Sequence, residues 1–463
     1  MNPLQKNQEI LITIKRIGIN GEGIGYYKKL AVFVKGALPG EECVVKITKV
    51  YDKYSEAELV RVKGEESVHR VKPRCPYYDK CGGCDLQHLA YEYQLKIKKD
   101  LVMESFKRYY NKELNPKIFK DTLGMENPWH YRNKAKLPVR YDGEKLVTGL
   151  YQSDSNILVY INNCDIEKED VRSAVDKITK VLTKNQVIAY HPKSKEGVLR
   201  HIVVRSSDFT KEIQVTLILY KNDKRTIEIA KNLIGIENVV SVYYSINDDS
   251  DAIESFGHSL TLIAGKETIV EKLGDLEFNL LPNSFFQLNR TQTEVLYDQV
   301  VKYGKFNGTE KVLDAYCGVG TIGTWISKYV KEVKGIDNNK EAIINAKENV
   351  KLNNITNAEY YCGDVLRKLE ELKTKGWTPD IIVVDPPRMG MDIRLLNYLQ
   401  KSPVEKIIYV SCNPATLAKN CDHLQKHYHI LAVQCLDMFP QTSNVESITL
   451  LSHKNTDKNI NIK

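Results

Sequence analysis

The sequence predicts an α/β protein in three parts: a small N-terminal β-barrel, a central α+β region carrying a cysteine cluster, and a C-terminal doubly wound parallel sheet. Strand-like runs with glycine turns and no helical period fill residues 1–62. Three cysteines fall within residues 75–84. From residue 311, strands and helices alternate, as is typical of βαβ units. We therefore expect domains at residues 1–64, 65–285 and 286–463.

The composition is that of an ordinary globular protein: of 463 residues, 42% are hydrophobic and 27% are charged. No run approaches the roughly 20 apolar residues of a membrane span, and the first residues lack the apolar core of a secretory signal. We therefore expect a cytoplasmic, monomeric protein that does not contact membranes. Ten cysteines in that compartment favour metal binding or catalysis over disulfides.

The N-terminal part reads as a small basic barrel. Strands are expected at Glu9–Ile17, Ala31–Val34, Glu42–Val50 and Tyr54–Val62, with a glycine-rich turn over Gly18–Gly25. Residues 1–74 hold 14 Lys and Arg against 9 Asp and Glu, which is most of the excess behind the net charge of +8. These features fit an RNA-binding module. A solvated face of any β-domain would carry the same charges.

Helical and strand patterns follow in order. An amphipathic helix is expected over residues 91–109, two further helices near residues 167–182 and 225–233 among strands, and another over Thr291–Lys305. Strands are then expected at Lys311–Tyr316, Glu332–Ile336, Glu359–Tyr361, Asp380–Val384, Lys406–Val410, Ile430–Cys435 and Ser447–Leu451. Such a sheet binds its ligands at the carboxyl ends of its strands.

A loop that suits a nucleotide-like cofactor spans Asp314-Ala-Tyr-Cys-Gly-Val-Gly320. Gly318 and Gly320 let the backbone approach a ligand with no Cβ in the way, although a plain tight turn would look the same. Asp337, at the tip of the next strand, can bind both ribose hydroxyls, and Asp364 can accept from the amino group of adenine. The third glycine that a dinucleotide needs is missing. The pattern therefore favours S-adenosylmethionine and a methyltransferase over a dehydrogenase.

Three candidate reactive groups lie at the ends of the later strands. Asp385-Pro-Pro-Arg388 forms a rigid turn because each proline fixes φ, so it can hold a planar group beside the methyl donor. Cys412 ends the next strand and is a candidate nucleophile. Glu446 precedes the last strand and could remove a proton from the substrate. Taken singly, Cys412 also fits a buried structural cysteine and Glu446 a surface charge.

Six motifs occur in order along the chain: Cys75-x5-Cys81-Gly-Gly-Cys84, Ser284-Phe-Phe-Gln287, Asp314 to Thr321, Asp385-Pro-Pro-Arg, Ser411-Cys-Asn-Pro and Asp437-Met-Phe-Pro…Val-Glu446. Together they resemble the RNA 5-methyluridine methyltransferases, particularly the members that act on 23S ribosomal RNA. The resemblance covers nearly the whole chain and includes an N-terminal barrel similar to a TRAM domain. The chain differs at Asp337, where glutamate is commoner, and at Gln441, where many relatives carry histidine.

The resemblance implies a Rossmann-like methyltransferase fold and S-adenosylmethionine-dependent methylation of carbon 5 of a uridine in 23S ribosomal RNA. It makes Cys412 the nucleophile that adds to carbon 6 and Glu446 the base. The donor contacts that it implies are Gln287, Tyr316, Thr321, Asp337, Asp364 and Asp385. It adds Cys164 to Cys75, Cys81 and Cys84 as the ligands of a 4Fe–4S cluster. Four thiolates could also hold zinc, and spacing alone does not choose.

RNA contacts outside the reaction centre are expected from Arg132, Phe285 and Arg388. Arg132 lies in Trp129-His-Tyr-Arg-Asn-Lys134, where aromatic and basic groups alternate, as suits stacking and phosphate contact. A structural role would explain the same residues.

Three other functions stay open. The same reaction on transfer RNA is the rival within the class. A non-catalytic RNA-binding ribosome-assembly factor would have no use for both Cys412 and Glu446. An amino-group methyltransferase built around Asp385-Pro-Pro would not require Cys412.

Overall fold

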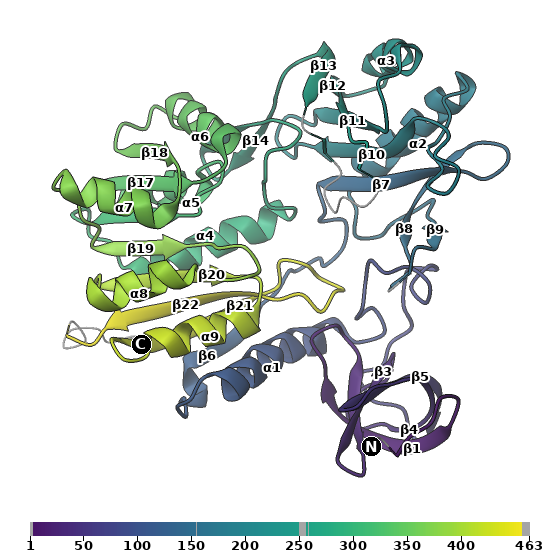
Figure 1. Cartoon of the computed structure of the whole chain (residues 1–463), viewed down its shortest axis with the longest axis horizontal. Helices are drawn as coiled ribbons and strands as arrows, with labels where there is room; N and C mark the ends of the chain where they lie inside the picture. Colours follow the sequence, from purple (N-terminus) through teal and green to yellow (C-terminus); the bar gives the residue numbers. More distant parts are fainter. Residues whose placement is uncertain (1–2, 154, 250–255, 258, 456–463) are drawn as a thin grey trace.

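The computed structural model describes residues 3–153, 155–249, 256–257 and 259–455. It contains a closed N-terminal barrel, a seven-stranded central sheet and an eight-stranded sheet flanked by helices (Figure 1). The predicted fold class is confirmed. The barrel packs on the start of helix α1 (Tyr91–Tyr109), where Ile17 and Leu38 meet Ile97 and Leu101 in one buried cluster.

The barrel closes in the strand order β1-β2-β3-β5-β4. Its strands are β1 (Glu9–Ile17), β2 (Gly23–Tyr27), β3 (Leu30–Lys35), β4 (Glu42–Val50) and β5 (Tyr54–Lys63). Residues of β1 alternate between interior and surface, as a half-buried strand requires. The expected glycine turn extends only to residue 22. Gly23 already belongs to β2, where it pairs with Val34, and only glycine fits there because a Cβ would lie 2.5 Å from the carbonyl oxygen of Ala37.

The central sheet has the order β13-β12-β11-β10-β7-β8-β9. Its strands are β7 (Lys134–Tyr141), β8 (Leu146–Tyr151), β9 (Leu158–Tyr160), β10 (Leu199–Ser206), β11 (Ile213–Leu219), β12 (Val239–Ile246) and β13 (Leu260–Gly265). Helices α2 (Glu169–Lys184) and α3 (Lys224–Ala230) match the two expected helices. Val171, Val175 and Ile178 of α2 share one buried cluster with the sheet.

The C-terminal sheet has the order β18-β17-β16-β19-β20-β22-β21-β6. Its strands are β6 (Phe119–Leu123), β16 (Lys311–Ala315), β17 (Glu332–Asp337), β18 (Ala358–Cys362), β19 (Ile381–Val384), β20 (Lys406–Ser411), β21 (Tyr428–Leu436) and β22 (Glu446–His453). Strands β16 to β20 are parallel, and the order reverses between β16 and β19. Ligands of such sheets bind at that switch point. In contrast to the all-parallel expectation, β22 runs antiparallel between β20 and β21.

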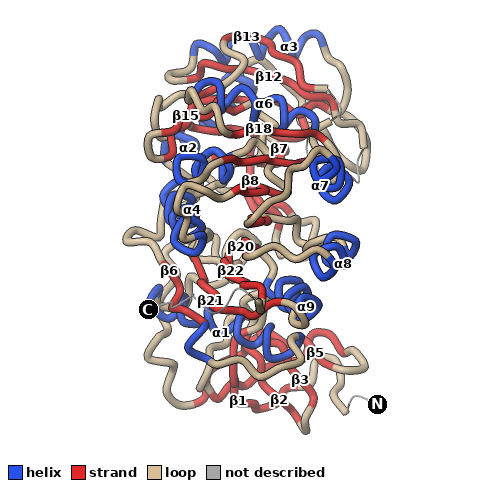
Figure 2. The backbone as a smooth tube through the Cα atoms, turned by 90° about the vertical axis from the view of Figure 1, so that its left-hand side faces the viewer, coloured by secondary structure: helices blue, strands red, loops and turns tan. Residues whose placement is uncertain are grey.

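Helices cover both faces of this sheet. They are α4 (Arg290–Gly304), α5 (Thr321–Ile326), α6 (Lys340–Leu352), α7 (Val365–Thr374), α8 (Ile393–Lys401) and α9 (Pro414–Leu424). Figure 2 shows α7, α8 and α9 along one side and α4 along the other. Because side chains of a strand alternate, Ile381 and Val383 join one core while Ile382 and Val384 join the other. The hairpin β14 (Ile269–Leu273) and β15 (Leu276–Leu280) packs into the first of these cores. Short 3-10 helices occupy Pro116–Ile118, Lys231–Gly235 and Ser327–Tyr329.

Two early elements complete the C-terminal sheet. Strand β6 pairs in parallel with β21, and Val102 and Phe106 of α1 pack into the core on the α9 side. The sequence pattern does not predict a strand at the residues of β6. None of the helices in the described part of the chain combines the length and apolar character that a bilayer crossing demands.

Candidate active site

Three strand ends meet at one edge of the C-terminal sheet. Asp385 follows β19, Cys412 follows β20, and Glu446 begins β22. Strands β19 and β20 are parallel neighbours, while Ser411 of β20 pairs directly with Ser447 of the antiparallel β22. The start of β22 therefore lies at the carboxyl edge of the parallel strands, and the structure brings these three predicted residues together.

Cys412 lies in the turn between β20 and α9. Asn413 caps α9 by accepting from the amides of Ala415 and Thr416 (3.1 and 3.4 Å), and Pro414 takes the first helical position. Burial, the largest cause, and the nearby Glu446 and Asp385 together raise the pKa of the Cys412 thiol to about 11, and Arg388 opposes them. The thiol is therefore protonated at rest, and Arg388 is the cation that favours its thiolate.

The Asp385–Arg388 turn is tied to the cysteine turn. The Arg388 carbonyl accepts from Asn413 Nδ2 (3.1 Å) and Thr416 Oγ1 (3.2 Å). Burial raises the pKa of Asp385 to about 7. Burial also raises the pKa of Glu446 well above its ordinary value; Asp385 adds to this, and Arg388 and Lys98 oppose it. The charges of Asp385, Arg388 and Glu446 therefore affect one another at the same edge of the sheet.

The two glycines of the cofactor loop differ in purpose. A Cβ on Gly318 (φ +53°) would meet no atom within 4 Å, so the space beside it is open, as expected for a ligand-facing position. A Cβ on Gly320 (φ +78°) would lie 2.6 Å from the Tyr360 ring. Glycine is thus required at position 320 by packing beneath the loop, and its role in admitting a ligand stays a prediction.

Carboxylates surround this loop. Asp337 accepts from the Gly318 amide (3.0 Å) and the Asn339 amide (2.8 Å). Beneath the loop, Asp314 accepts from the Gly323 amide (2.8 Å), and its Oδ1 has no hydrogen-bond partner among the described residues. Burial raises the pKa of Asp314 to about 8, with contributions from Asp385 and Asp337. The loop therefore lies in a strongly acidic environment.

The other residues predicted to bind the methyl donor make contacts within the protein. Thr321 Oγ1 pairs with the Tyr297 hydroxyl (2.6 Å), and Tyr316 adopts a left-handed backbone (φ 64°) directly after β16. Asp364 is exposed, caps α7 and forms an ion pair with Arg394 (3.0 Å). Gln287 is half-buried, and its carbonyl accepts from Asn133 Nδ2 (3.2 Å).

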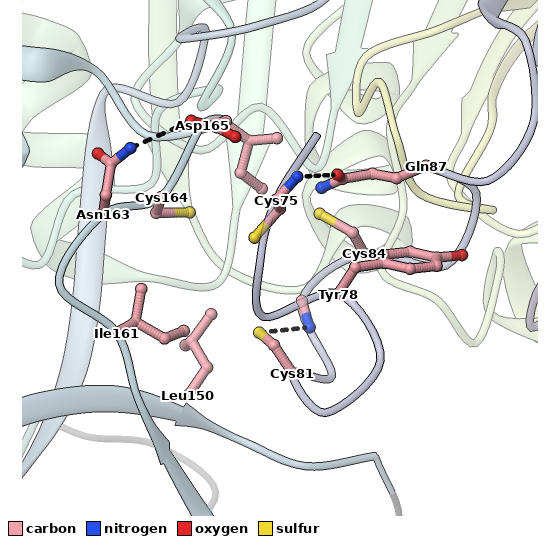
Figure 3. Close-up of a pocket in the computed structure, with 12 residues that line it drawn as sticks. Cys75, Tyr78, Cys81, Cys84, Gln87, Leu150, Ile161, Asn163, Cys164 and Asp165 are labelled. Atoms are coloured by element: carbon pink, nitrogen blue, oxygen red, sulfur yellow. Dashed lines mark hydrogen bonds between the residues drawn. The ribbon is translucent and has the colours of Figure 1, made fainter. Parts of the chain in front are cut away.

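The four predicted cysteine ligands line one pocket. They are Cys75, Cys81, Cys84 and Cys164, and Figure 3 shows their sulfur atoms pointing into the shared space. Burial raises the pKa of each of these thiols, that of Cys164 to about 12. All ten cysteines of the chain are free thiols.

A metal centre can be tested against this pocket. Within the described ranges, no three His, Cys, Asp or Glu side chains lie close enough to share one metal ion. A single zinc ion would need thiolates about 2.3 Å from one centre. Four thiols around one pocket are the donor set that an iron–sulfur cluster would use.

The predicted RNA contacts divide into exposed and internal groups. Phe285 is 69% exposed, and Arg388 is exposed beside the active-site edge. Arg132 is half-buried, and its Nε donates to the Lys134 carbonyl (3.0 Å). Its neighbour Tyr131 is buried, and its hydroxyl donates to the Pro440 carbonyl (3.0 Å), so part of this aromatic and basic motif is structural.

Two polar residues of α1 were missed by the sequence analysis. Gln94 and Lys98 are buried, and both bind the loop that precedes Glu446. Their signal was available: they share a helical stripe with the apolar Ile97, Leu101 and Val102.

Comparison with known proteins identifies the family of the chain. The chain matches the family model described as tRNA (Uracil-5-)-methyltransferase over residues 90–454 and that of the TRAM domain over residues 3–60. A Bacillus cereus protein described as an uncharacterized RNA methyltransferase is 44% identical over 97% of this chain and 98% of its own length. A Listeria innocua protein of the same description is 42% identical over 98% of this chain and 99% of its own.

A solved structure extends the similarity to the fold. The Pyrococcus abyssi tRNA (uracil-54, C5)-methyltransferase, in complex with S-adenosyl-L-homocysteine, superposes with a TM-score of 0.74 at 29% identity. The match covers 96% of this chain and all of that one. The family resemblance seen in the sequence is thereby confirmed, and with it S-adenosylmethionine as methyl donor. The chain belongs to the RNA uracil-5 methyltransferase family and carries an N-terminal TRAM domain.

Proposed function

We propose that this protein methylates carbon 5 of one uridine in 23S ribosomal RNA through a covalent adduct between Cys412 Sγ and carbon 6 of the base. The observation that carries this proposal is the Ser411–Ser447 pairing, which sets Cys412 and Glu446 next to each other on one sheet edge. The nucleophile, the base and the donor loop all come from one chain, so we take the monomer as the active species. An RNA substrate of this kind implies action in the cytoplasm.

The reaction needs a nucleophile because carbon 5 of uracil attacks a methyl group too weakly by itself. The Cys412 thiol first loses its proton to solvent, which Arg388 favours, and the thiolate adds to carbon 6. This addition generates an enolate, which makes carbon 5 nucleophilic. S-adenosylmethionine, when bound, would supply the methyl group to carbon 5 and leave as S-adenosylhomocysteine. Glu446 then removes the proton from carbon 5, and the bond between carbon 6 and Cys412 Sγ breaks, which returns the thiolate. Two easier steps replace one difficult one.

Other residues prepare this reaction. Asp337 lies beside the donor loop. The carboxyl groups of Asp314 and Asp385, whose pKa values burial raises to about 8 and about 7, would ionise more readily beside a cationic sulfonium donor, since opposite charges attract strongly in a desolvated site. A uridine in structured RNA must leave its stack to reach Cys412. The exposed Phe285 and Arg388 are proposed to contact the RNA at this entrance, Arg132 to bind it nearby, and the barrel of residues 1–64 to bind it further away.

We also propose that Cys75, Cys81, Cys84 and Cys164 hold a 4Fe–4S cluster, because four desolvated thiols face one pocket. Anaerobically purified protein should then be brown and contain about four irons per chain. Cys84→Ala should lose the iron and the visible absorbance, while Cys43→Ala, inside the barrel, should keep both. Colourless protein loaded with zinc would contradict the proposal.

Transfer RNA is the second candidate substrate, favoured by the Pyrococcus abyssi enzyme named for uracil-54 of tRNA. The choice of 23S ribosomal RNA rests on the resemblance in the ordered sequence motifs. Incubation of the purified protein with labelled methyl donor and unmodified 23S ribosomal RNA or transfer RNA transcripts decides between them. Label in 5-methyluridine of the ribosomal transcript alone is the expected result, and label in the transfer RNA alone would overturn the substrate assignment.

A further inference from the structure

Helix α1 turns two polar side chains toward the interior. Gln94 is 1% exposed and Lys98 is fully buried. Both lie against the segment between β21 and β22, residues 437–445, which leads directly into Glu446 and is named here the base loop.

Lys98 binds the base loop at two points. Its Nζ donates to Asp437 Oδ1 (2.5 Å) and to the Phe439 carbonyl (3.0 Å), and neither charged side chain is exposed. The Tyr91 hydroxyl donates to the other Asp437 oxygen (2.9 Å). Burial of a lysine lowers the stability of the fold unless the charge is paired. The presence of Lys98 at a buried position therefore needs an explanation.

Gln94 holds the next part of the base loop. Its Nε2 donates to Gln441 Oε1 (3.1 Å), and its Oε1 accepts from the Gln441 amide (3.2 Å). Gln441 has a left-handed backbone (φ 70°), which a non-glycine residue adopts only when its surroundings impose it. The amides of Asp85 and Leu86 donate to the Gln441 carbonyl (3.1 and 3.0 Å), so the base loop is fixed from several sides.

Lys98 is one of two cations that lower the pKa of Glu446. Asp385, Arg388 and Lys98 act on the Glu446 carboxyl, and Cys412 lies near it. Of the two cations, Arg388 is exposed, whereas Lys98 is buried and bound to the base loop. Lys98 itself faces Asp437, Asp85 and Glu446.

We propose that Lys98 is a positioning residue for Glu446: through the base loop and its own charge it sets the carboxylate for removal of the carbon 5 proton, and it does not serve adduct formation. This inference rests on the proposed function. Loss of the Lys98 cation removes a charge that lowers the pKa of Glu446, so the carboxylate would form only at higher pH.

The test uses Lys98→Met and the double variant Lys98→Met/Asp437→Asn. The double variant leaves no uncompensated buried charge and keeps an acceptor for Tyr91, so it is expected to fold. Lys99→Met is the matched control, because Lys99 lies on the same helix and pairs with the exposed Asp121 (2.8 Å). Glu446→Gln is the benchmark for a lost base.

Two RNA probes separate the steps. One is the unmodified transcript that the enzyme methylates, and the other is the same transcript made with 5-fluorouridine, whose carbon 5 has no proton to remove. Covalent protein–RNA adduct is followed in a single turnover on denaturing gels. Both Lys98 variants should form the fluorinated adduct within about two-fold of the wild-type rate. With ordinary RNA they should accumulate adduct and release product about ten-fold more slowly or worse, as expected for a displaced general base. The acidic limb of release should move to higher pH.

Different results overturn different statements. Wild-type release by the double variant would mean that Lys98 only balances the charge of Asp437, and equal slowing with both RNAs would mean a merely structural role. Either result defeats the inference and leaves the proposed function standing. Absence of any adduct between wild-type protein and the fluorinated RNA would instead defeat the proposed function.

Discussion

Ser411 and Ser447 are direct partners in the antiparallel ladder between β20 and β22. This register decides which side chains meet at the reactive edge, because a slip of one residue would turn every side chain of β22 to the opposite face. Cys412 and Glu446 lie immediately beyond this pair, one on each strand.

Replacement of Cys412 by alanine should abolish turnover, since no other group supplies the proposed bond to carbon 6. The loss should be at least about 10³-fold in kcat, and no fluorinated adduct should form. Cys362→Ala, at an exposed cysteine in the same domain, should behave as the wild type. Substantial methylation by Cys412→Ala would remove the nucleophile assignment.

Glu446→Gln should form the methylated adduct and fail to release it, because an amide cannot take the carbon 5 proton. Raised pH should not restore release, whereas in the wild type release should increase as pH rises through the elevated pKa of Glu446. Mass spectrometry of the trapped species should show methylated RNA bound to Cys412. Normal product release would exclude Glu446 as the base.

Arg388→Ala should slow adduct formation and shift its pH dependence upward. The pKa of the Cys412 thiol is about 11, and Arg388 lowers it, so removal of the guanidinium leaves less thiolate at neutral pH. Arg388→Lys should recover part of the rate because it restores a positive charge. The measurement is the rate of adduct formation with the 5-fluorouridine RNA at pH values from about 6.5 to about 9.5. An unchanged profile in Arg388→Ala would contradict the argument.

Gly320→Ala should mainly lower stability, whereas Gly318→Ala should mainly weaken binding of the methyl donor. The first adds both a left-handed strain and a Cβ 2.6 Å from Tyr360, so it should cost about 2 kcal/mol or more of unfolding free energy. The second carries only the strain, about 1 kcal/mol, and should mainly weaken donor binding because its methyl enters the open side of the loop. Thermal unfolding and calorimetric titration with S-adenosylmethionine measure the two effects. Equal losses of stability would contradict the distinction.

Much of the C-terminal sheet could be predicted because its strands carry a strong local signal. The buried Ile381–Val384 run and the acidic or glycine-rich turns after β16 and β19 are readable from neighbouring residues alone. The antiparallel direction of β22 could not be read, because a strand's direction depends on where the chain returns. That direction is what brings Glu446 to the same edge as Cys412.

Contacts with partners far away in the chain could not be predicted from the local sequence. The pattern of β6 is short and weakly apolar, and only pairing with β21 makes it a strand. The helical stripe places Lys98 on the buried face of α1, but its partners Asp437 and Phe439 are visible only in the fold. In both cases the deciding contact spans more than half of the chain.

The position of β6 has a consequence for biosynthesis. Phe106 and Phe119, whose rings meet edge to face at 5.4 Å, emerge from the ribosome long before β21, and Gln434 reaches back across 313 positions to the Asp121 carbonyl. Until the last strands are made, this early apolar surface lacks the strand that covers it in the folded protein, and the reactive edge lacks Glu446. Methylation therefore begins only after translation of the whole polypeptide is finished.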